Sequence, residues 1–202
     1  MGIREMDVKI QGVSPLLMNR DDLKMWDPEK YSKQRGEEYL EMEERVWRDK
    51  AHFEAFSKED NPKVVVRDIW IKKCLIASQK QSGCPILPPG SKKRTDTLRN
   101  YFVSGVLIND SVVYDKNKKI VTKKDLQPFK AMVRPQKTGG KVCCIRPMIE
   151  TGWNCKVHIL IADAAIKEND IIQCLTWAGT YNGIGDWRVE RGGQFGRFTV
   201  VS

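Results

Sequence analysis

Hydrophobic and polar positions alternate in two well-separated stretches of the chain. In residues 6–11 the apolar side chains fall on even positions, and residues 153–162 alternate in the same way. This period of two predicts half-buried strands. A further strand is predicted at residues 142–149, and Thr151-Gly152 beyond it is typical of a turn. We therefore expect residues 142–149 and 153–162 to form a hairpin.

Two other stretches have the spacing of amphipathic helices. Residues 68–79 begin with Asp68, a residue type that caps helices well. Residues 168–181 are followed by Gly183, and glycine is common just beyond a helix end. Residues 195–201 are predicted to be the last strand.

The order strand, helix, strand, strand, helix, strand is that of the ferredoxin-like (RRM-like) fold. We predict one α+β domain over residues 1–202, with a βαββαβ core and two long insertions. Residues 19–63 are predicted to form a helical insertion, and residues 83–140 a basic loop or hairpin insertion. Segments of this length between elements usually carry function or an interface.

Charge is distributed unevenly along the chain. The net charge is +9, but residues 1–60 contain 11 Lys/Arg and 15 Asp/Glu, a net of −4. Residues 61–202 contain 24 Lys/Arg and 11 Asp/Glu, a net of +13. The basic part predicts binding to a polyanion that weakens as salt rises. The acidic part fits self-association with the basic body of another copy, and masking within one chain fits equally well.

The cysteine pattern does not indicate a cofactor. The six cysteines form no C-x-x-C pair, and the chain has two histidines. A zinc site needs clustered thiolate and imidazole ligands, so buried thiols are the simpler interpretation. No signal peptide or apolar run of membrane-spanning length stands out. We expect no cofactor, no membrane partner and a reducing, cytoplasmic setting.

The most distinctive segment is the loop at residues 182–198, with the sequence NGIGDWRVERGGQFGRF. Glycines let a backbone approach a phosphate, arginines pair with phosphate oxygens, and aromatic rings stack on unpaired bases. The residues that supply these properties are Gly183, Gly185, Gly192, Gly193, Gly196, Arg188, Arg191, Arg197, Trp187, Phe195 and Phe198. The position after a helix and the absence of G-K-[ST] exclude a P-loop. The alternative is a tight loop whose glycines only solve a backbone problem, with Trp187 and Phe198 in the core.

Together with the end of the first strand, this loop resembles the RAMP superfamily, the repeat-associated proteins of CRISPR effector complexes. The opening GVSPLLMNR ends at Arg20, and the ending has the form IGD-x-R followed by G-x-FGRF. The resemblance covers residues 6–20 and 168–202, and is closer to short RAMP-like proteins of phages and prokaryotic genomes. It implies a ferredoxin-like RNA-recognition fold, binding of a single strand, head-to-tail assembly along that strand, and CRISPR-type partner subunits.

Basic residues outside the loop are further candidates for contacts to a strand. One group lies in a loop flanked by proline and glycine, and another flanks Gly139-Gly140 in a predicted thumb-like hairpin. For each of them, a solvated surface group is the alternative. The candidates are Arg20, Lys92, Lys93, Arg94, Arg134, Lys137, Lys141 and Arg146.

Catalysis is not expected from this sequence. Some members of the wider superfamily cut RNA with a histidine or an aspartate. Here His52 lies in the helical insertion and His158 in a strand, and the sequence places no acid or base partner beside either. Asp21 and Asp22 are more simply a helix cap or a solvated pair than a metal site.

Three hypotheses remain. The first is a protein that binds single-stranded RNA or DNA with little sequence preference. The second is a RAMP-type endoribonuclease that uses His52 or His158. The third is a phage-encoded mimic of a CRISPR backbone subunit, with an anti-CRISPR-like role. The sequence does not separate RNA from DNA, because a reader of the 2′-hydroxyl is defined by geometry.

Overall fold

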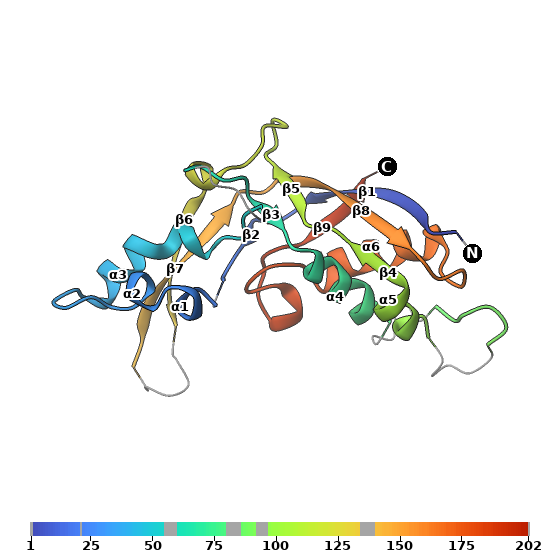
Figure 1. Cartoon of the computed structure of the whole chain (residues 1–202), viewed down its shortest axis with the longest axis horizontal. Helices are drawn as coiled ribbons and strands as arrows, with labels where there is room; N and C mark the ends of the chain where they lie inside the picture. The colour runs from blue at the N-terminus through green and yellow to red at the C-terminus, as the bar shows by residue number, and fades with distance from the viewer. Residues whose placement is uncertain are drawn as a thin grey trace.

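The computed structural model describes residues 2–20, 22–54, 60–79, 86–91, 97–133 and 140–201. Helices make up 33% and strands 31%, and the sheets are antiparallel, which confirms the predicted α+β class. The two sheets lie at opposite ends of an elongated molecule (Figure 1). Both chain termini lie at the end with the larger sheet (Figure 1).

The larger sheet is built around the first strand. In the described part of the chain its order is β3-β5-β8-β1-β9, and β4 also pairs with β8. Val8 lies opposite Val157 in the register of β1 and β8, so both inner faces are apolar. The strands are β1 (Arg4–Gly12), β3 (Val65–Val66), β4 (Val106–Ile108), β5 (Ser111–Tyr114), β8 (Asn154–Ile161) and β9 (Phe198–Val201).

Helices cover one face of the larger sheet (Figure 1). Leu75 and Leu175 are buried on this side, and Phe198 of β9 joins them in the same core. The helices are α4 (Asp68–Ser78), α5 (Arg99–Gly105) and α6 (Glu168–Tyr181). The bounds of α6 agree with the predicted helix at 168–181. None of the helices in the described part of the chain is long and apolar enough to cross a membrane.

The smaller sheet lies at the other end of the molecule, with short helices against it (Figure 1). Its order is β2-β7-β6, and β6 and β7 form an antiparallel pair from Gln127↔Met148 to Val133↔Val142. The strands are β2 (Leu16–Leu17), β6 (Gln127–Val133) and β7 (Val142–Ile149). The helices are α1 (Leu23–Trp26), α2 (Pro28–Tyr31) and α3 (Tyr39–Val46), followed by a 3₁₀ turn at Trp47–Lys50.

The predicted hairpin of residues 142–149 with 153–162 is wrong. The two strands exist, but β7 pairs with β2 and β6, whereas β8 pairs with β1, β4 and β5. The reason is a double bend. The backbone of Gly12 bonds both Trp153 and Gly152, and beyond this point the two chain segments pair again as β2 and β7. The turn therefore carries the chain from one sheet to the other.

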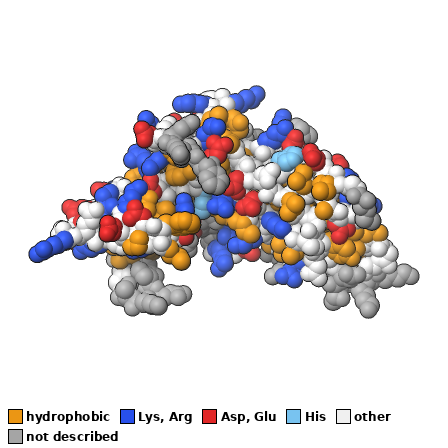
Figure 2. Space-filling model, viewed as in Figure 1, with side chains coloured by type: hydrophobic (Ala, Val, Ile, Leu, Met, Phe, Trp, Pro, Cys, Tyr) orange, Lys and Arg blue, Asp and Glu red, His pale blue; other side chains and the backbone are white. Residues whose placement is uncertain are grey.

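Much of the acidic part of the chain is paired within the chain itself. Glu44 pairs with Lys130 of β6 and Asp49 pairs with Lys123. Glu43 is buried, and its carboxylate accepts hydrogen bonds from Lys50 and from the backbone N–H of Ile145. Figure 2 shows Lys/Arg and Asp/Glu side chains interspersed over this end of the molecule. Masking within one chain thus accounts for several of these carboxylates.

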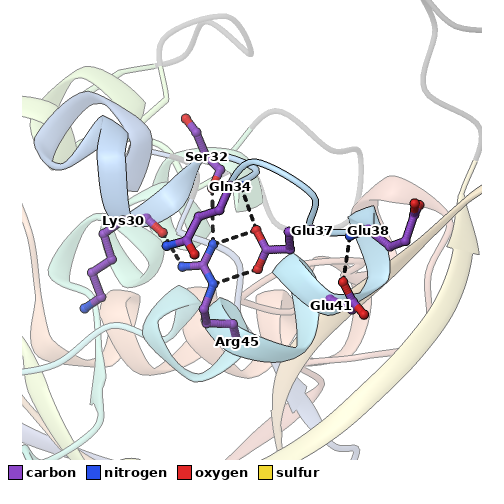
Figure 3. A network of polar contacts seen from close by, with 7 residues as sticks. All are labelled: Lys30, Ser32, Gln34, Glu37, Glu38, Glu41 and Arg45. Carbon is purple, nitrogen blue, oxygen red and sulfur yellow. Dashed lines mark hydrogen bonds and ion pairs between the residues drawn. The ribbon is translucent and has the colours of Figure 1, made fainter.

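The side chain of Arg45 bonds to the end of α2 and to the segment between α2 and α3 (Figure 3). Arg45 forms a two-pronged contact with the carboxylate of Glu37, at 2.8 and 3.0 Å. It also donates to the carbonyl oxygens of Lys30 and Ser32. This arginine lowers the pKa of Glu37 to about 2, with help from a backbone hydrogen bond.

Candidate nucleic-acid interface

The glycine-rich loop follows α6 directly and ends at β9, as predicted. The backbone N–H groups of Asn182 and Gly183 both donate to the carbonyl of Ala178, which closes the end of the helix. Gly183 has a φ of +67°, a left-handed conformation that glycine adopts without strain. The helix end therefore sets the direction in which the loop leaves.

The loop is hydrogen-bonded to the chain segment that follows β1. The backbone N–H of Asp186 donates to the carbonyl oxygen of Leu17 at 2.8 Å, and the N–H of Gly196 donates to Pro15 at 2.8 Å. The N–H of Arg197 donates to the hydroxyl of Ser14 at 2.9 Å. The two sequence motifs that resemble the RAMP superfamily thus form one structural unit.

Several glycines of the loop are required by close packing. A Cβ at Gly185 would lie 2.3 Å from the Leu17 carbonyl oxygen, and a Cβ at Gly196 would lie 1.8 Å from that of Ile184. A Cβ at Gly193 would meet the backbone of Trp187, whereas at Gly192 it would meet none of the residues that the structure describes. The interpretation of a tight loop is therefore right for the packing of these glycines. It leaves the role of the loop's charged and aromatic side chains open.

The aromatic side chains of the loop form a cluster with a strand of the smaller sheet. The ring centroid of Phe129 lies 5.7 Å from that of Trp187 and 5.1 Å from that of Phe195. Trp187 and Phe195 are partly exposed, and they line a shallow pocket of about 320 Å³ with Arg191. Phe198 is buried in the core. The sequence analysis missed Phe129, whose only signal was its place in the basic segment before β7.

The arginines of the site fall into two groups. Arg188 pairs with Glu190 at 3.0 Å, and Arg146 of β7 pairs with Asp186 at 2.8 Å. Arg20 pairs with Asp22. The charge of each of these three arginines is therefore partly neutralised by a carboxylate of the protein itself.

Arg191 and Arg197 form the second group. Both side chains are exposed, and neither forms an ion pair with any residue that the structure describes. Lys141, next to the start of β7, is exposed and equally unpaired within the described ranges. These three cations have their charge available to a ligand. The candidates Lys92, Lys93, Arg94, Arg134 and Lys137 lie outside the described residues.

A small polar pocket of about 80 Å³ lies between α4 and the loop. Lys73 of α4 and Arg188 line it, and Asn182 contributes a buried side-chain amide whose nitrogen and oxygen make no hydrogen bond in the described part of the chain. The thiol of Cys74 donates to the carbonyl oxygen of Gly183 and helps to hold the two walls together. Burial raises the pKa of Cys74 to about 12, so this thiol is not a nucleophile at neutral pH.

The two histidines have different surroundings. His52 packs edge-on against Trp70, with the ring centroids 5.0 Å apart, and burial lowers its pKa to about 4. His158 lies on the helix-free face of the larger sheet, and its Nδ1 atom is 3.0 Å from a carboxylate oxygen of Asp7. The sequence placed no partner beside His158, whereas the register of β1 and β8 supplies one. Lys156, which also contacts Asp7, contributes most to lowering the pKa of that carboxyl.

The described residues contain no cluster of three or more His, Cys, Asp or Glu side chains that could hold a metal ion. Asp22 accepts hydrogen bonds from Arg20 and Trp26 and so has protein partners. Asp21 lies outside the described residues. Cys74, Cys144, Cys155 and Cys174 are buried.

The sequence itself matches no protein-family model and no curated protein. Solved structures are similar over almost the whole chain. A chain of the Type III-B Cmr-beta complex bound to cognate target RNA aligns with a TM-score of 0.55 and 11% identity, over 99% of this chain and 59% of that one. Cmr6 from Pyrococcus furiosus aligns over 100% of both chains, with a TM-score of 0.52 and 9% identity. A chain of a Type IV-B CRISPR complex aligns with a TM-score of 0.53 and 8% identity, over 98% of this chain and 90% of that one.

This chain shares the fold of these three structures, which are RAMP-type proteins. The likeness confirms, at the level of fold, the resemblance seen in residues 6–20 and 168–202. In this fold the opening segment and the glycine-rich loop meet where the two sheets join. The chain spans about three-fifths of the length of the Cmr-beta chain that it matches.

Proposed function

We propose that this protein binds single-stranded nucleic acid with little sequence preference, through the exposed side of the glycine-rich loop. The observation that carries the proposal is the pair of arginines Arg191 and Arg197. Both are exposed and have no acidic partner in the described structure, on a loop that is otherwise tightly hydrogen-bonded. Charged side chains held by a rigid backbone bind phosphate at a low entropic cost.

The aromatic cluster supports the same function. Trp187 and Phe195 are partly exposed beside Arg191, and the ring of Phe129 packs against both of them. An aromatic face next to an arginine is a suitable surface for stacking an unpaired base, whatever its sequence. Duplex bases are already stacked on each other, so we propose a single strand as the ligand.

We also propose that the larger sheet is a ferredoxin-like core in a modified form. Along the chain, β1, α4, β4 with β5, β8, α6 and β9 come in the order strand, helix, strand, strand, helix, strand, with the remaining elements inserted between them. Both β4 and β5 pair with β8. In this interpretation β4 and β5 take the place that residues 142–149 had in the sequence-based scheme. The similarity to chains of RNA-bound and CRISPR complexes supports RNA as the preferred ligand and CRISPR-type subunits as partners.

The experiment that tests the proposed function starts from the protein as purified. Its absorbance at 260 and 280 nm is measured, and any bound nucleic acid is then digested with ribonuclease or deoxyribonuclease. We expect co-purifying nucleic acid that ribonuclease removes. Protein free of nucleic acid, with no affinity for added RNA or DNA, would overturn the proposal. Protein that instead co-purifies with CRISPR subunits would favour the phage-encoded mimic.

We propose that binding occurs without cleavage. The ring of His52 packs edge-on against Trp70, and burial lowers its pKa to about 4, which makes it the weaker of the two candidates for acid–base work. The observation that favours the nuclease alternative is the contact between His158 and Asp7, because a carboxylate can orient a histidine for acid–base work. Incubation of labelled RNA with the protein and with His158→Ala separates the two. Cleavage that the variant abolishes would overturn this proposal.

Self-association along a strand is proposed from an exposed apolar pair. Met25 and Trp26 of α1 are 86% and 75% exposed, and these adjacent apolar side chains offer a surface that a partner can cover. We propose that a second copy does so when both are bound to one strand. Light scattering with and without a long single strand tests this, with Trp26→Ser as the variant. Equal assembly by the variant would contradict it.

A further inference from the structure

The larger sheet carries a second basic surface, on the face without helices. In the register of β1 and β8, Lys9 lies opposite Lys156. In the next row outward, Gln11 lies opposite Asn154, which in turn lies opposite Tyr114 of β5. These residues alternate with buried residues of the same strands, so their side chains point away from the core.

The same side chains line a groove of about 540 Å³, called the lysine groove here. Lys116 and Lys118 extend the groove beyond the end of β5, and Val201 of β9 lies on its other side. Four lysines thus surround one hollow. Lys156 contacts Asp7, whereas the other three form no ion pair within the described ranges.

The turn that presents two of these lysines is tightly fixed. One carboxylate oxygen of Asp115 accepts from the backbone N–H groups of Asn117, at 2.8 Å, and Lys119, at 2.9 Å. The side chain of Asn154 donates to the carbonyl oxygen of Asp115 and ties the turn to β8. The backbone that carries Lys116 and Lys118 is therefore fixed before any ligand arrives.

Two features of the lysine groove destabilise the protein on its own. Lys9 lies directly opposite Lys156, and like charges at such positions repel, although the ion pair of Lys156 with Asp7 offsets part of this. Lys118 has a φ of +64°, a left-handed conformation that is unfavourable for a residue with a Cβ. Residues held in sparsely populated backbone conformations cluster at ligand-binding and active sites. An anion in the groove would relieve the repulsion.

We propose that the lysine groove is a second binding site for the phosphodiester backbone of single-stranded nucleic acid, separate from the glycine-rich loop. A chain of phosphates can contact several lysines in a row, and the ring of Tyr114 offers a face for a base. The acidic segment of another copy fits less well. Its carboxylates Glu37, Glu43, Glu44 and Asp49 already pair with cations of their own chain.

The test uses fluorescence anisotropy with a labelled single-stranded RNA of about 20 nucleotides, over a range of salt concentrations. The groove variant is Lys9→Gln with Lys116→Gln. Loss of two phosphate contacts should lower the slope of log affinity against log salt by roughly 1.4, which is about a tenfold weaker affinity at 0.15 M salt. The matched control, Lys33→Gln with Arg35→Gln, removes the same charge from exposed positions outside the groove. We expect it to bind like the parent protein.

A second variant separates binding from folding. Lys118→Gly should raise the melting temperature by a few degrees, because it removes the backbone strain, and still weaken RNA binding. Groove variants that bind RNA as the control does would overturn the proposal. So would groove variants that lose self-association but keep full RNA affinity, because the partner would then be an acidic protein surface. The groove site does not depend on the loop, so variants of Arg191 and Arg197 report on the proposed function separately.

Discussion

The backbone N–H of Asp186 donates a 2.8 Å hydrogen bond to the carbonyl oxygen of Leu17. This contact joins the glycine-rich loop to the short strand β2, although the two lie far apart in sequence. The side chain of Asp186 pairs at the same time with Arg146 of β7. One residue thus ties the loop to two strands of the smaller sheet, and the position of the proposed binding surface depends on it.

The first prediction concerns the glycine beside this contact. Gly185→Ala should destabilise the protein strongly, since the new Cβ would lie 2.3 Å from the Leu17 carbonyl oxygen at a φ of +81°. Overpacking and backbone strain of this kind cost roughly 1–3 kcal/mol each. Chemical denaturation measures the change in the free energy of unfolding.

Gly192→Ala is the matched control for Gly185→Ala. Gly192 has nearly the same φ, +79°, but no described residue lies within 4 Å of its added Cβ. Gly192→Ala should therefore lower the free energy of unfolding only by the cost of a left-handed backbone at alanine, about 1 kcal/mol. Equal losses in the two variants would show that the loop does not pack against Leu17 as described.

The second prediction concerns the buried carboxylate under the smaller sheet. Glu43 is 3% exposed, and burial lowers the pKa of its partner Lys50. Glu43→Gln leaves this ammonium without its counter-charge, which should cost about 3 kcal/mol of unfolding free energy. Glu44→Gln is the control, because its pair with Lys130 is about half exposed and should cost under about 1 kcal/mol. Similar losses would contradict the buried pair.

The third prediction concerns stability at acidic pH. His52 has a pKa of about 4 in the fold, against an ordinary 6.5, chiefly because it is buried and secondly because Arg67 and Arg20 are near. The unfolded chain therefore binds the proton more readily, and stability falls as pH drops from 6.5 towards 4. The loss is on the order of 3 kcal/mol.

His52→Phe keeps a ring against Trp70 but cannot be protonated. Its unfolding free energy should fall less than that of the parent protein between pH 6.5 and 4. Carboxylates titrate equally in both proteins, so the difference between the two curves isolates the histidine. Parallel curves would mean that His52 is accessible and protonates in the fold, which would also return it to the list of catalytic candidates.

The fourth prediction concerns the contacts of Arg45 that Figure 3 shows. Arg45→Lys keeps the charge but loses the two-pronged contact with Glu37 and the bonds to Lys30 and Ser32. Hydrogen exchange of residues 28–38 should become faster in this variant. Arg35→Lys is the control, as its exposed side chain has no ion pair in the described structure. Unchanged exchange in Arg45→Lys would mean that other contacts hold the segment.

The sequence predicted individual elements well because local periodicity determines them. The helix at 168–181 and the strand at 142–149 have the bounds that were expected. Pairing was less predictable. Residues 142–149 and 153–162 have a local turn signal between them, and only the bonds of Gly12 to Trp153 and Gly152 show that the chain changes sheets there.

The candidate site shows the same limit. The loop was identified from its composition, but its neighbours come from distant parts of the chain. Phe129 of the smaller sheet contacts Trp187 of the loop, and Asp7 of β1 contacts His158 on the neighbouring strand β8. Arginines also look alike in sequence, whereas the structure shows that Arg146 and Arg188 are paired, and Arg191 has no ion pair with the residues that it describes. Such distinctions depend on tertiary contacts.

The most direct test of the central claim is the affinity for a labelled single strand of about 20 nucleotides, measured by anisotropy from 0.05 to 0.3 M salt. The loop variant is Arg191→Gln with Arg197→Gln, and Lys33→Gln with Arg35→Gln is the control of equal charge. We expect the loop variant to bind about tenfold more weakly at 0.15 M salt, with a slope of log affinity against log salt that is lower by roughly 1.4. Affinity and slope equal to those of the control would contradict it.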